Sequence, residues 1–285
     1  MPEKAEPAPK SVGFMQRHHF LLRRLHSLTG VMPIGVFLIV HLTTNSSIVW
    51  GILNGSRSVP GHAGAYTFQH EVNFIHSLPA LLLIEIFGLW LPIAFHSILG
   101  VYYATTGKSN VAHYGYQDNW RYTLQRVSGY VGVLFIFYHV ATLRWGWTFL
   151  VPGGTKWSAE YAASTMAMAL RGGESITVWG IVVSLFYLLG ASLLVFHFAN
   201  GLWTAAITWG LTISKAAQRR WGYACAGLGA GMMVMAWSAV LGFLTLDPAE
   251  ARAVEEAMLR GPGVEVVAPA DAPTTTSAPT TPNDR

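Results

Sequence analysis

Five long apolar runs constrain this chain of 285 residues more than any other feature. An α-helix needs about 20 predominantly apolar residues to cross the hydrocarbon of a bilayer. Only 11% of the residues are charged, against about 25% in soluble domains. The sequence therefore predicts an all-α membrane protein, a five-transmembrane-helix bundle that is multi-pass in the cell inner (cytoplasmic) membrane. The predicted spans are residues 25–42, 78–103, 127–143, 176–209 and 223–246.

The basic residues indicate how the bundle lies in the membrane. Eleven of the 18 Lys and Arg residues fall in the N-terminal leader and in the connections after the second and fourth spans. Because Lys and Arg are enriched in cytoplasmic loops, we expect a cytoplasmic N-terminus and an external C-terminus. This topology accounts for the net charge of +4, so no nucleic-acid partner is indicated. The single cysteine, Cys225, excludes an internal disulfide.

Three parts follow along the chain. Residues 1–24 form a cytoplasmic N-terminal segment, whose part 13–24 reads as an interfacial helix, and residues 25–246 form the membrane domain. The connections 45–77 and 144–175 are long external segments. Residues 247–285 are external. There, 248–260 reads as an amphipathic helix with Pro at its start and Gly just past its end. The termini, 1–10 and 262–285, are predicted to be disordered.

Four of the 11 histidines lie inside predicted spans, one on each of the first four. An ionisable side chain at membrane depth is costly and by default faces the bundle interior with a function. One such histidine could simply hydrogen-bond across helices, but four favour a shared function. At the rise of a helix, His41 and His139 lie roughly 25 and 20 Å from the cytoplasmic ends of their spans. His96 and His197 lie roughly 27 and 32 Å from the external ends.

These depths group the histidines at two levels, His41 with His139 in the outer half and His96 with His197 near the inner boundary. A haem iron has two axial positions that imidazoles on facing helices can fill, so the pattern predicts two bis-histidine haems. A structural zinc site is tetrahedral, which two histidines without carboxylates or thiols fit poorly. Glycines within two turns of these histidines have no side chain and would leave space between the helices for a flat macrocycle. They are Gly35, Gly100, Gly132, Gly190 and Gly201.

Several dispersed motifs resemble those of one family. Residues 23–30 read RRLHSLTG, residues 125–129 read QRVSG, and residues 197–203 read HFANGLW. Shorter matches are EIF at 85–87, LP at 91–92, GVY at 100–102 and TWG at 208–210. Over roughly residues 20 to 240, the chain resembles the di-haem cytochrome b membrane anchor subunit (five-helix, single-anchor type) of succinate:quinone oxidoreductases, which comprise succinate dehydrogenases and fumarate reductases.

The resemblance implies haem b at both levels, held by the positions that match His41, His139, His96 and His197. It also implies a flavoprotein subunit and an iron–sulfur subunit on the cytoplasmic side. Electrons would pass from the last cluster through the inner and outer haems to a quinone, commonly menaquinone in this branch. The expected function is that of the membrane anchor and electron-transfer subunit of succinate dehydrogenase (complex II), which couples succinate oxidation to the quinone pool. Such a subunit performs no dicarboxylate chemistry, and the quinone reaction site lies within it.

Candidates for the quinone and for the haem edges rest on that resemblance. Where relatives carry an acidic residue just before the second span, this chain has His76, so Glu71, Glu85 or His76 could handle the quinone protons. Glu85 lies about 10 Å below the external end of its span, and an interhelical hydrogen bond is an equal alternative for it. At the inner level, a cluster could bind haem propionates or equally anchor the helices at the interface. Its members are His26, Ser27, Trp120 and Arg126.

Two other functions stay open at this stage, together with the direction of the reaction. One is the di-haem anchor of another quinone-linked dehydrogenase, although the motifs at 23–30 and 197–203 favour the succinate family. The other is a transporter with a histidine proton relay, which would lack the absorbance of a bis-imidazole haem. Neither the quinone nor the choice between succinate oxidation and fumarate reduction follows from the sequence.

Overall fold

A computed structural model describes residues 13–54, 63–106 and 117–260 of the chain. Within these ranges all regular elements are helices, and five of them are long and apolar enough to cross a membrane. The predicted all-α membrane fold with five spans is confirmed. The termini predicted to be disordered, 1–10 and 262–285, lie outside the described residues. The spans are His19–Trp50, Leu81–Thr106, Trp120–Leu143, Val178–Thr208 and Lys215–Thr245.

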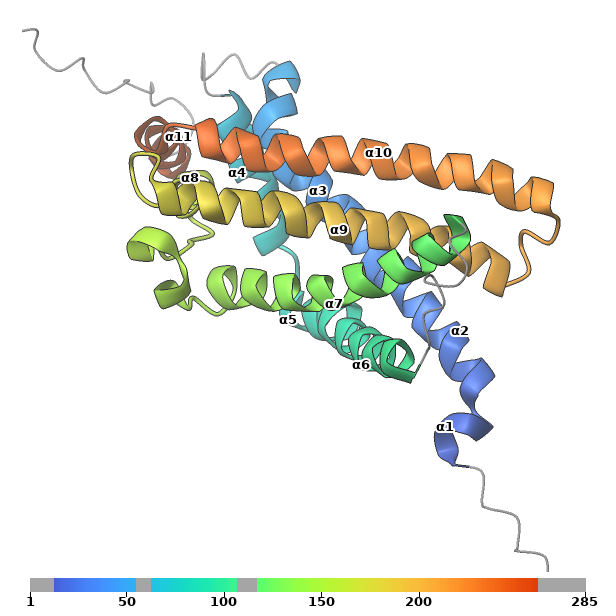
Figure 1. The fold of residues 1–285 in the computed structure, drawn as a ribbon. Helices are drawn as coiled ribbons and strands as arrows, with labels where there is room; N and C mark the ends of the chain where they lie inside the picture. The colour runs from blue at the N-terminus through green and yellow to red at the C-terminus, as the bar shows by residue number, and fades with distance from the viewer. Residues whose placement is uncertain (1–12, 55–62, 107–116, 261–285) are drawn as a thin grey trace, which may run out of the picture.

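The fourth span forms the middle of the bundle. Helix α9 (Val178–Thr208) packs against α10 (Lys215–Thr245) on one side and against α7 (Gln117–Leu143) on the other (Figure 1). The first span crosses these helices obliquely, and its outer part also packs against α10. Large apolar side chains on the outward faces remain exposed, for example Ile98, Leu185 and Val234 at 70%, 59% and 69%. Lipid chains would cover such a surface in a membrane.

The first two spans are each interrupted by one π-helical turn. Span one consists of α2 (His19–Thr29), η1 (Gly30–Ile34) and α3 (Gly35–Trp50). Span two consists of α5 (Leu81–Glu85), η3 (Ile86–Trp90) and α6 (Leu91–Thr106). A proline accompanies each turn, Pro33 inside η1 and Pro92 just after η3. Proline cannot donate in the helix ladder and its ring crowds the carbonyl four residues earlier, so a wider turn relieves both spans. The two π-turns pack against each other.

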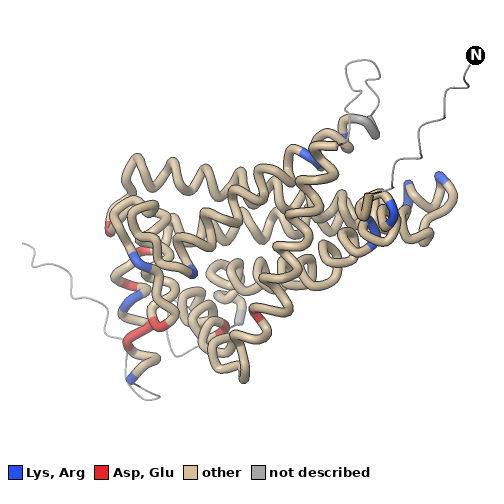
Figure 2. Tube along the Cα trace, turned by 90° about the horizontal axis from the view of Figure 1, so that it is seen from below, with Lys and Arg blue, Asp and Glu red and all other residues tan. Residues whose placement is uncertain are grey.

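The helix bounds depart from the predicted ones mainly at the ends of the spans. The interfacial helix predicted at 13–24 is instead a short α1 (Phe14–Arg17), and α2 then runs continuously into span one. Lys and Arg residues lie mostly toward the two ends of the bundle, and its long middle part carries few charged residues (Figure 2). This distribution supports the transmembrane placement, while the predicted cytoplasmic N-terminus stays a prediction.

Three helices outside the spans pack together at the end of the bundle that carries the C-terminal helix (Figure 1). They are α4 (Ala63–His76), α8 (Ala162–Arg171) and α11 (Pro248–Arg260). We call them the cap. The amphipathic helix predicted at 248–260 has the bounds of α11. The helices α4 and α8 were not predicted, because the segments that contain them were interpreted only as long connections.

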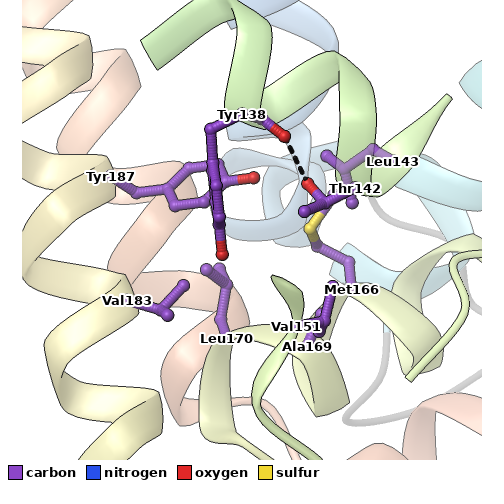
Figure 3. A pocket seen from close by; sticks show the side chains of 9 residues that line it. All are labelled: Tyr138, Thr142, Leu143, Val151, Met166, Ala169, Leu170, Val183 and Tyr187. Atoms are coloured by element: carbon purple, nitrogen blue, oxygen red, sulfur yellow. Dashed lines mark hydrogen bonds between the residues drawn. The ribbon is translucent and has the colours of Figure 1, made fainter. Parts of the chain in front are cut away.

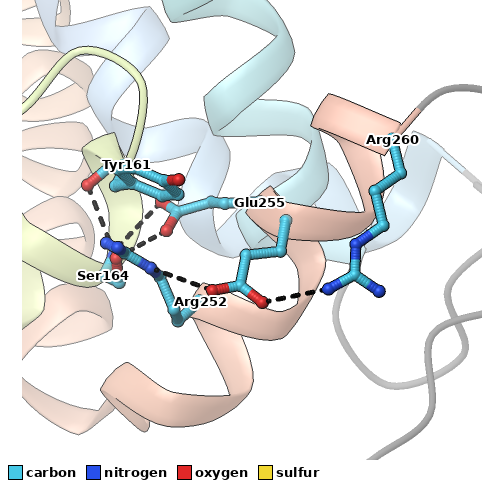
Figure 4. A network of polar contacts seen from close by, with 6 residues as sticks. Tyr161, Ser164, Arg252, Glu255 and Arg260 are labelled. Carbon is cyan, nitrogen blue, oxygen red and sulfur yellow. Dashed lines mark hydrogen bonds and ion pairs between the residues drawn. The ribbon is translucent and has the colours of Figure 1, made fainter.

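Glu255 of α11 joins two helices of the cap (Figure 4). Its side chain is fully buried and accepts hydrogen bonds from the backbone N–H groups of Ala163 and Ser164 at 2.7 and 3.0 Å. The Ser164 hydroxyl donates to its other oxygen. These N–H groups belong to the first turn of α8, where no intrahelical acceptor exists. Nearby, the Arg252 guanidinium lies 3.3 Å from the centre of the Tyr161 ring. Glu255 thus caps α8 from another helix.

Replacement of Glu255 tests this cap. In Glu255→Ala the donors of Ala163 and Ser164 lose a buried partner, and we expect hydrogen exchange of the α8 and α11 amides to accelerate at least about tenfold, the factor for ~1.4 kcal/mol. Glu255→Gln keeps an acceptor for both N–H groups and should exchange within about threefold of wild type. Equal exchange in wild type and Glu255→Ala would contradict the capping role.

The pH dependence gives a second test of the same residue. Burial raises the pKa of Glu255 above its usual value, although the Ser164 and Ala163 donors act in the opposite direction. The folded cap therefore binds a proton more readily than the unfolded chain, and the contribution of this carboxyl to stability is lost as the pH rises through the raised pKa. Corrected for intrinsic exchange, α11 should be better protected at about pH 5 than at about pH 8, and Glu255→Gln should remove that difference.

Candidate functional site

The outer histidines face each other across two helices. His41 of α3 and His139 of α7 have ring centres 5.7 Å apart, with ring planes at 89°. Aromatic rings surround them, with Phe37 against His41 at 5.2 Å and Tyr187 against His139 at 5.8 Å. The Nδ1 atom of His139 is buried and has no hydrogen-bond partner among the described residues. The outer level is thus an apolar and aromatic site with two imidazoles at its centre.

The inner histidines form a similar pair with different surroundings. The ring centres of His96 on α6 and His197 on α9 lie 6.1 Å apart, with planes at 83°. The Nδ1 atom of His96 lies 2.9 Å from the His26 carbonyl oxygen, and Nδ1 of His197 lies 3.1 Å from the Gln125 carbonyl oxygen. A carbonyl only accepts, so each Nδ1 carries the proton. Each Nε2 then keeps its lone pair, which is the arrangement usual for metal-ligating histidines.

The spacing within each pair can be compared with that around a metal ion. An ion bound to two imidazole nitrogens at about 2 Å each separates the two ring centres by roughly 6 Å, close to the observed 5.7 and 6.1 Å. Within the described ranges no group of three or more His, Cys, Asp and Glu residues could hold a metal ion. A two-ligand site suits an ion whose remaining positions are filled by its own macrocycle.

Two glycines allow the helices to approach the inner pair closely. A Cβ atom on Gly30 would lie 2.5 Å from Cε1 of His96, and one on Gly129 would lie 3.0 Å from Cε1 of His197. Any side chain at Gly30 would therefore displace the His96 ring. The five glycines named from the sequence do not include these two. The sequence relates each histidine only to glycines on its own helix, whereas Gly30 and Gly129 reach His96 and His197 from other spans.

Several polar atoms at the inner level are buried without a partner in the described structure. They include Nδ1 of His26, the hydroxyl of Tyr103 and Nε of Arg24. His26 stacks on the His96 ring at 4.0 Å, and Tyr103 lies 5.8 Å from His26. Buried polar atoms of this kind need a hydrogen-bond partner, and acidic groups at the edge of a bound cofactor would accept from the Tyr103 hydroxyl and the Arg24 Nε. The sequence indicated His26 but not Tyr103 or Arg24, which was counted only as a topology signal.

The other residues of the predicted inner cluster are placed differently. Arg126 donates from its guanidinium to the carbonyl of Ala104 on α6. Trp120 is 53% exposed near the start of the third span, and Ser27 is half-buried beside His26. The structure thus brings His26 against the inner histidines, and it ties Arg126 to the second span.

The candidates for quinone chemistry lie at the outer end. Glu85 forms an ion pair with Arg144 at 2.9 Å, which joins span two to the end of α7. The rings of Trp90 and Trp145 stack at 6.2 Å beside the same connection. Glu85 is therefore not isolated, because Arg144 at the end of α7 donates a hydrogen bond to its carboxylate; its role in quinone chemistry stays a prediction.

The other two candidates, His76 and Glu71, sit on α4 in the cap. The His76 ring lies 6.3 Å from Trp157, and Glu71 lies 4.0 Å from the ring of His70. Both candidates thus belong to the cap rather than to the second span.

A small cavity lies next to the outer level, between α7, α8 and α9 (Figure 3). Its volume of about 10 Å³ is room for one water molecule and for no substrate. The Tyr138 hydroxyl donates to the Leu150 carbonyl at 3.0 Å, and the Thr142 hydroxyl donates to the Tyr138 carbonyl at 2.9 Å. Tyr138, Thr142 and Tyr187 line the cavity together with apolar side chains such as Leu170 and Val183 (Figure 3).

Five helices long and apolar enough to span a membrane, with two pairs of facing histidines among them, define a multi-pass membrane protein. The chain is 37% identical over 200 residues to the succinate dehydrogenase cytochrome b558 subunit of Bacillus subtilis (strain 168). The match spans 70% of this chain and 85% of the relative. The chain therefore belongs to the family of succinate dehydrogenase cytochrome b subunits. No protein-family model and no solved structure matches it.

The close approach of Gly30 gives a test of the inner pair. Gly30→Ala places a methyl group against the His96 ring, so we expect a haem held by the inner pair to be lost and the haem-to-protein ratio to fall by about one. Gly227→Ala is the matched control, because the space around Gly227 holds no atom within 4 Å. It should leave the ratio unchanged, as measured by pyridine haemochrome. Full haem content in Gly30→Ala would show that the inner pair holds none.

Proposed function

We propose that this chain is the membrane anchor and electron-transfer subunit of a succinate dehydrogenase (complex II) that carries electrons from an iron–sulfur subunit to a quinone. It would hold two haems b, the outer one on His41 and His139 and the inner one on His96 and His197. The observation that carries the proposal is the two facing histidine pairs, in a chain 37% identical to a cytochrome b subunit. Bound haem supplies a one-electron carrier within a layer of low dielectric constant.

The side chains around each pair support the assignment through what they do to the imidazoles. The carbonyls of His26 and Gln125 hold the Nδ1 protons of His96 and His197, and so direct both Nε2 atoms toward the site. Phe37, Phe135 and Tyr187 exclude water from the outer pair. The orphaned donors of His26, Tyr103 and Arg24 suit the propionates of the inner haem.

The partners follow from the orientation. We place the end with α1 and the α9–α10 turn in the cytoplasm, because its connections carry the excess of Lys and Arg. The iron–sulfur subunit would dock there, next to the inner pair, and the flavoprotein subunit would bind to it. The cap would then lie outside, above the outer pair. The inner level would then serve the soluble subunits, and the outer level would serve the quinone.

The quinone, menaquinone in this proposal, would react at the outer level, with Glu85 or His76 handling its protons. The ion pair of Glu85 with Arg144 supports a site here, because charged groups are rare within apolar spans and mark functional positions. Glu85 would take or give a proton as the quinone changes redox state, and Arg144 would hold the carboxylate in place between turnovers. The stacked rings of Trp90 and Trp145 offer a flat apolar surface beside it.

The haem assignment has a direct test. Purified protein should contain about two low-spin haems per chain. Because the imidazole planes within each pair are nearly perpendicular, the ferric signals in electron paramagnetic resonance should be strongly anisotropic. His41→Ala and His139→Ala should remove one redox transition, and His96→Ala and His197→Ala the other. If His41→Ala and His96→Ala abolish the same transition, the pairing is wrong, and absence of a haem band would favour a transporter.

The quinone site is tested by the ion pair. Glu85→Gln keeps size and hydrogen bonding but deletes the titrating group, so quinone-linked turnover should fall at least about tenfold. Both haems and succinate oxidation by an artificial acceptor should persist. Arg144→Gln breaks the same pair but keeps the carboxyl and should lose less. Equal losses would assign the effect to the ion pair itself. Normal turnover in Glu85→Gln and in His76→Ala would move the quinone site away from the outer end.

A further inference from the structure

A chain of side-chain hydrogen bonds runs from a cation to the inner histidine His197. The Arg121 Nε donates to Oδ1 of Asn200 at 2.9 Å, and Nδ2 of Asn200 donates to Oε1 of Gln125 at 2.8 Å. The Gln125 Nε2 then donates to the backbone carbonyl of His197 at 3.0 Å. The guanidinium of Arg121 also lies 3.9 Å from the centre of the Trp203 ring. This chain, Arg121–Asn200–Gln125, links α7 to α9 directly below the inner pair.

Each bond of the chain fixes the orientation of the next amide. Arg121 only donates, so the oxygen of Asn200 must face it and the NH₂ group must face Gln125. The oxygen of Gln125 then faces Asn200, and its NH₂ group faces the His197 carbonyl. A flipped Gln125 amide would oppose its oxygen to that carbonyl and its NH₂ to the NH₂ of Asn200. A cation at one end therefore determines the direction of every bond up to the histidine.

Gln125 holds His197 at two points. Its side chain donates to the His197 carbonyl, while its own backbone carbonyl lies 3.1 Å from the Nδ1 of the same histidine. The Ser128 hydroxyl, one turn further along α7, lies 3.2 Å from that Nδ1. Both the backbone and the ring of His197 are thus fixed to α7. Asn200 is only 5% exposed, so water cannot readily replace its bonds.

We propose that Asn200 and Gln125 are positioning residues that hold His197 in the orientation needed to ligate the inner haem, with Arg121 setting the direction of their hydrogen bonds. The inference rests on the proposed function, because it assumes that His197 is an axial ligand. It goes beyond the ligand assignment in naming side chains that never touch the haem iron. The other three histidines have no such chain within the described residues. His96 has only the His26 carbonyl, and the Nδ1 of His139 has no partner.

Loss of the Asn200 amide should loosen the ligation without removing the haem. In Asn200→Leu, Gln125 loses the donor that orients its amide, so the bond to His197 is no longer enforced. An iron with two firmly bound imidazoles has no position for carbon monoxide, whereas one with a loosened imidazole binds it. The carbon-monoxide-reactive fraction of the reduced inner haem should rise about fivefold, the change in population expected for one hydrogen bond.

A set of variants separates this role from simple space filling. Asn200→Asp keeps the volume and the acceptor for Arg121 but turns the donor toward Gln125 into a second acceptor, so it should behave like Asn200→Leu. Gln125→Glu keeps the acceptor for Asn200, loses the donor to His197, and should show the same increase. Asn45→Leu is the matched control, because Asn45 donates to the His41 carbonyl at 2.8 Å in the outer pair. It should leave the inner haem unreactive.

The measurement is carbon monoxide binding to the dithionite-reduced, purified complex, with the inner haem identified as the transition that His96→Ala removes. If His197→Ala fails to remove that transition, the ligand assignment is wrong and the proposed function fails. If His197→Ala removes it but Asn200→Leu, Asn200→Asp and Gln125→Glu stay as unreactive as wild type, only the positioning role fails. The positioning role would also be overturned if Asn200→Asp alone behaved like wild type. The same holds if Asn45→Leu raised the carbon monoxide reactivity of the inner haem as much as Asn200→Leu does.

Discussion

The hydrocarbon of a bilayer contains no water, so each ring nitrogen of a histidine buried there needs a partner within the protein or on a bound group. The partners of the histidine ring nitrogens differ between the inner and the outer level. At the inner level the His26 and Gln125 carbonyls take the Nδ1 protons, which leaves only the Nε2 atoms to be satisfied. At the outer level His139 keeps a buried Nδ1 without a partner among the described residues. The packing of the helices holds the two imidazole rings of each pair opposite each other.

Facing rings require a correct helix register, and the two π-turns contribute to it. A π-turn adds a residue to one turn of a helix and so rotates everything beyond it. In span one η1 lies between His26 and His41, and in span two η3 lies between Glu85 and His96. These turns therefore set the angular relation between the inner and outer groups of each span. The depth of each histidine changes little, so an estimate from the rise of an ideal helix still grouped them by level.

The five spans were predictable because each is a long apolar run, and α11 because Pro248 and Gly261 frame an amphipathic stretch. The helices α4 and α8 were not, for a physical reason. Much of the buried surface of α8 consists of small residues such as Ala162, Ala163 and Ala167, and its 10 residues lie inside a long connection and are too few for a span. Buried Gln69 and Glu255 look like surface residues in a sequence. Only the tertiary packing shows that Gln69 accepts a hydrogen bond from the Ala162 N–H at the start of α8 and that Glu255 caps the same helix.

The candidate site also contains residues that the sequence could predict and residues that it could not. The four histidines could be grouped from composition and depth, because a polar residue in an apolar run stands out. The ion pair of Glu85 with Arg144 and the orphaned donors of Arg24 and Tyr103 could not be anticipated. Arg24 and Arg144 sit at span ends, where topology alone explains a cation. The Gln125–Asn200 bond joins residues 75 positions apart, and no local pattern indicates it.

These differences make the two levels electrostatically unequal. The inner pair lies at the end of an oriented chain of amides that begins at the charge of Arg121, and charges act more strongly where the dielectric constant is low. The outer pair is surrounded by Phe37, Phe135 and Tyr187, and Arg144 at its end of the bundle is neutralised by Glu85. Two identical carriers in these environments would not be equivalent. Under the proposed function, residues that ligate neither haem would therefore influence how electrons divide between the two levels.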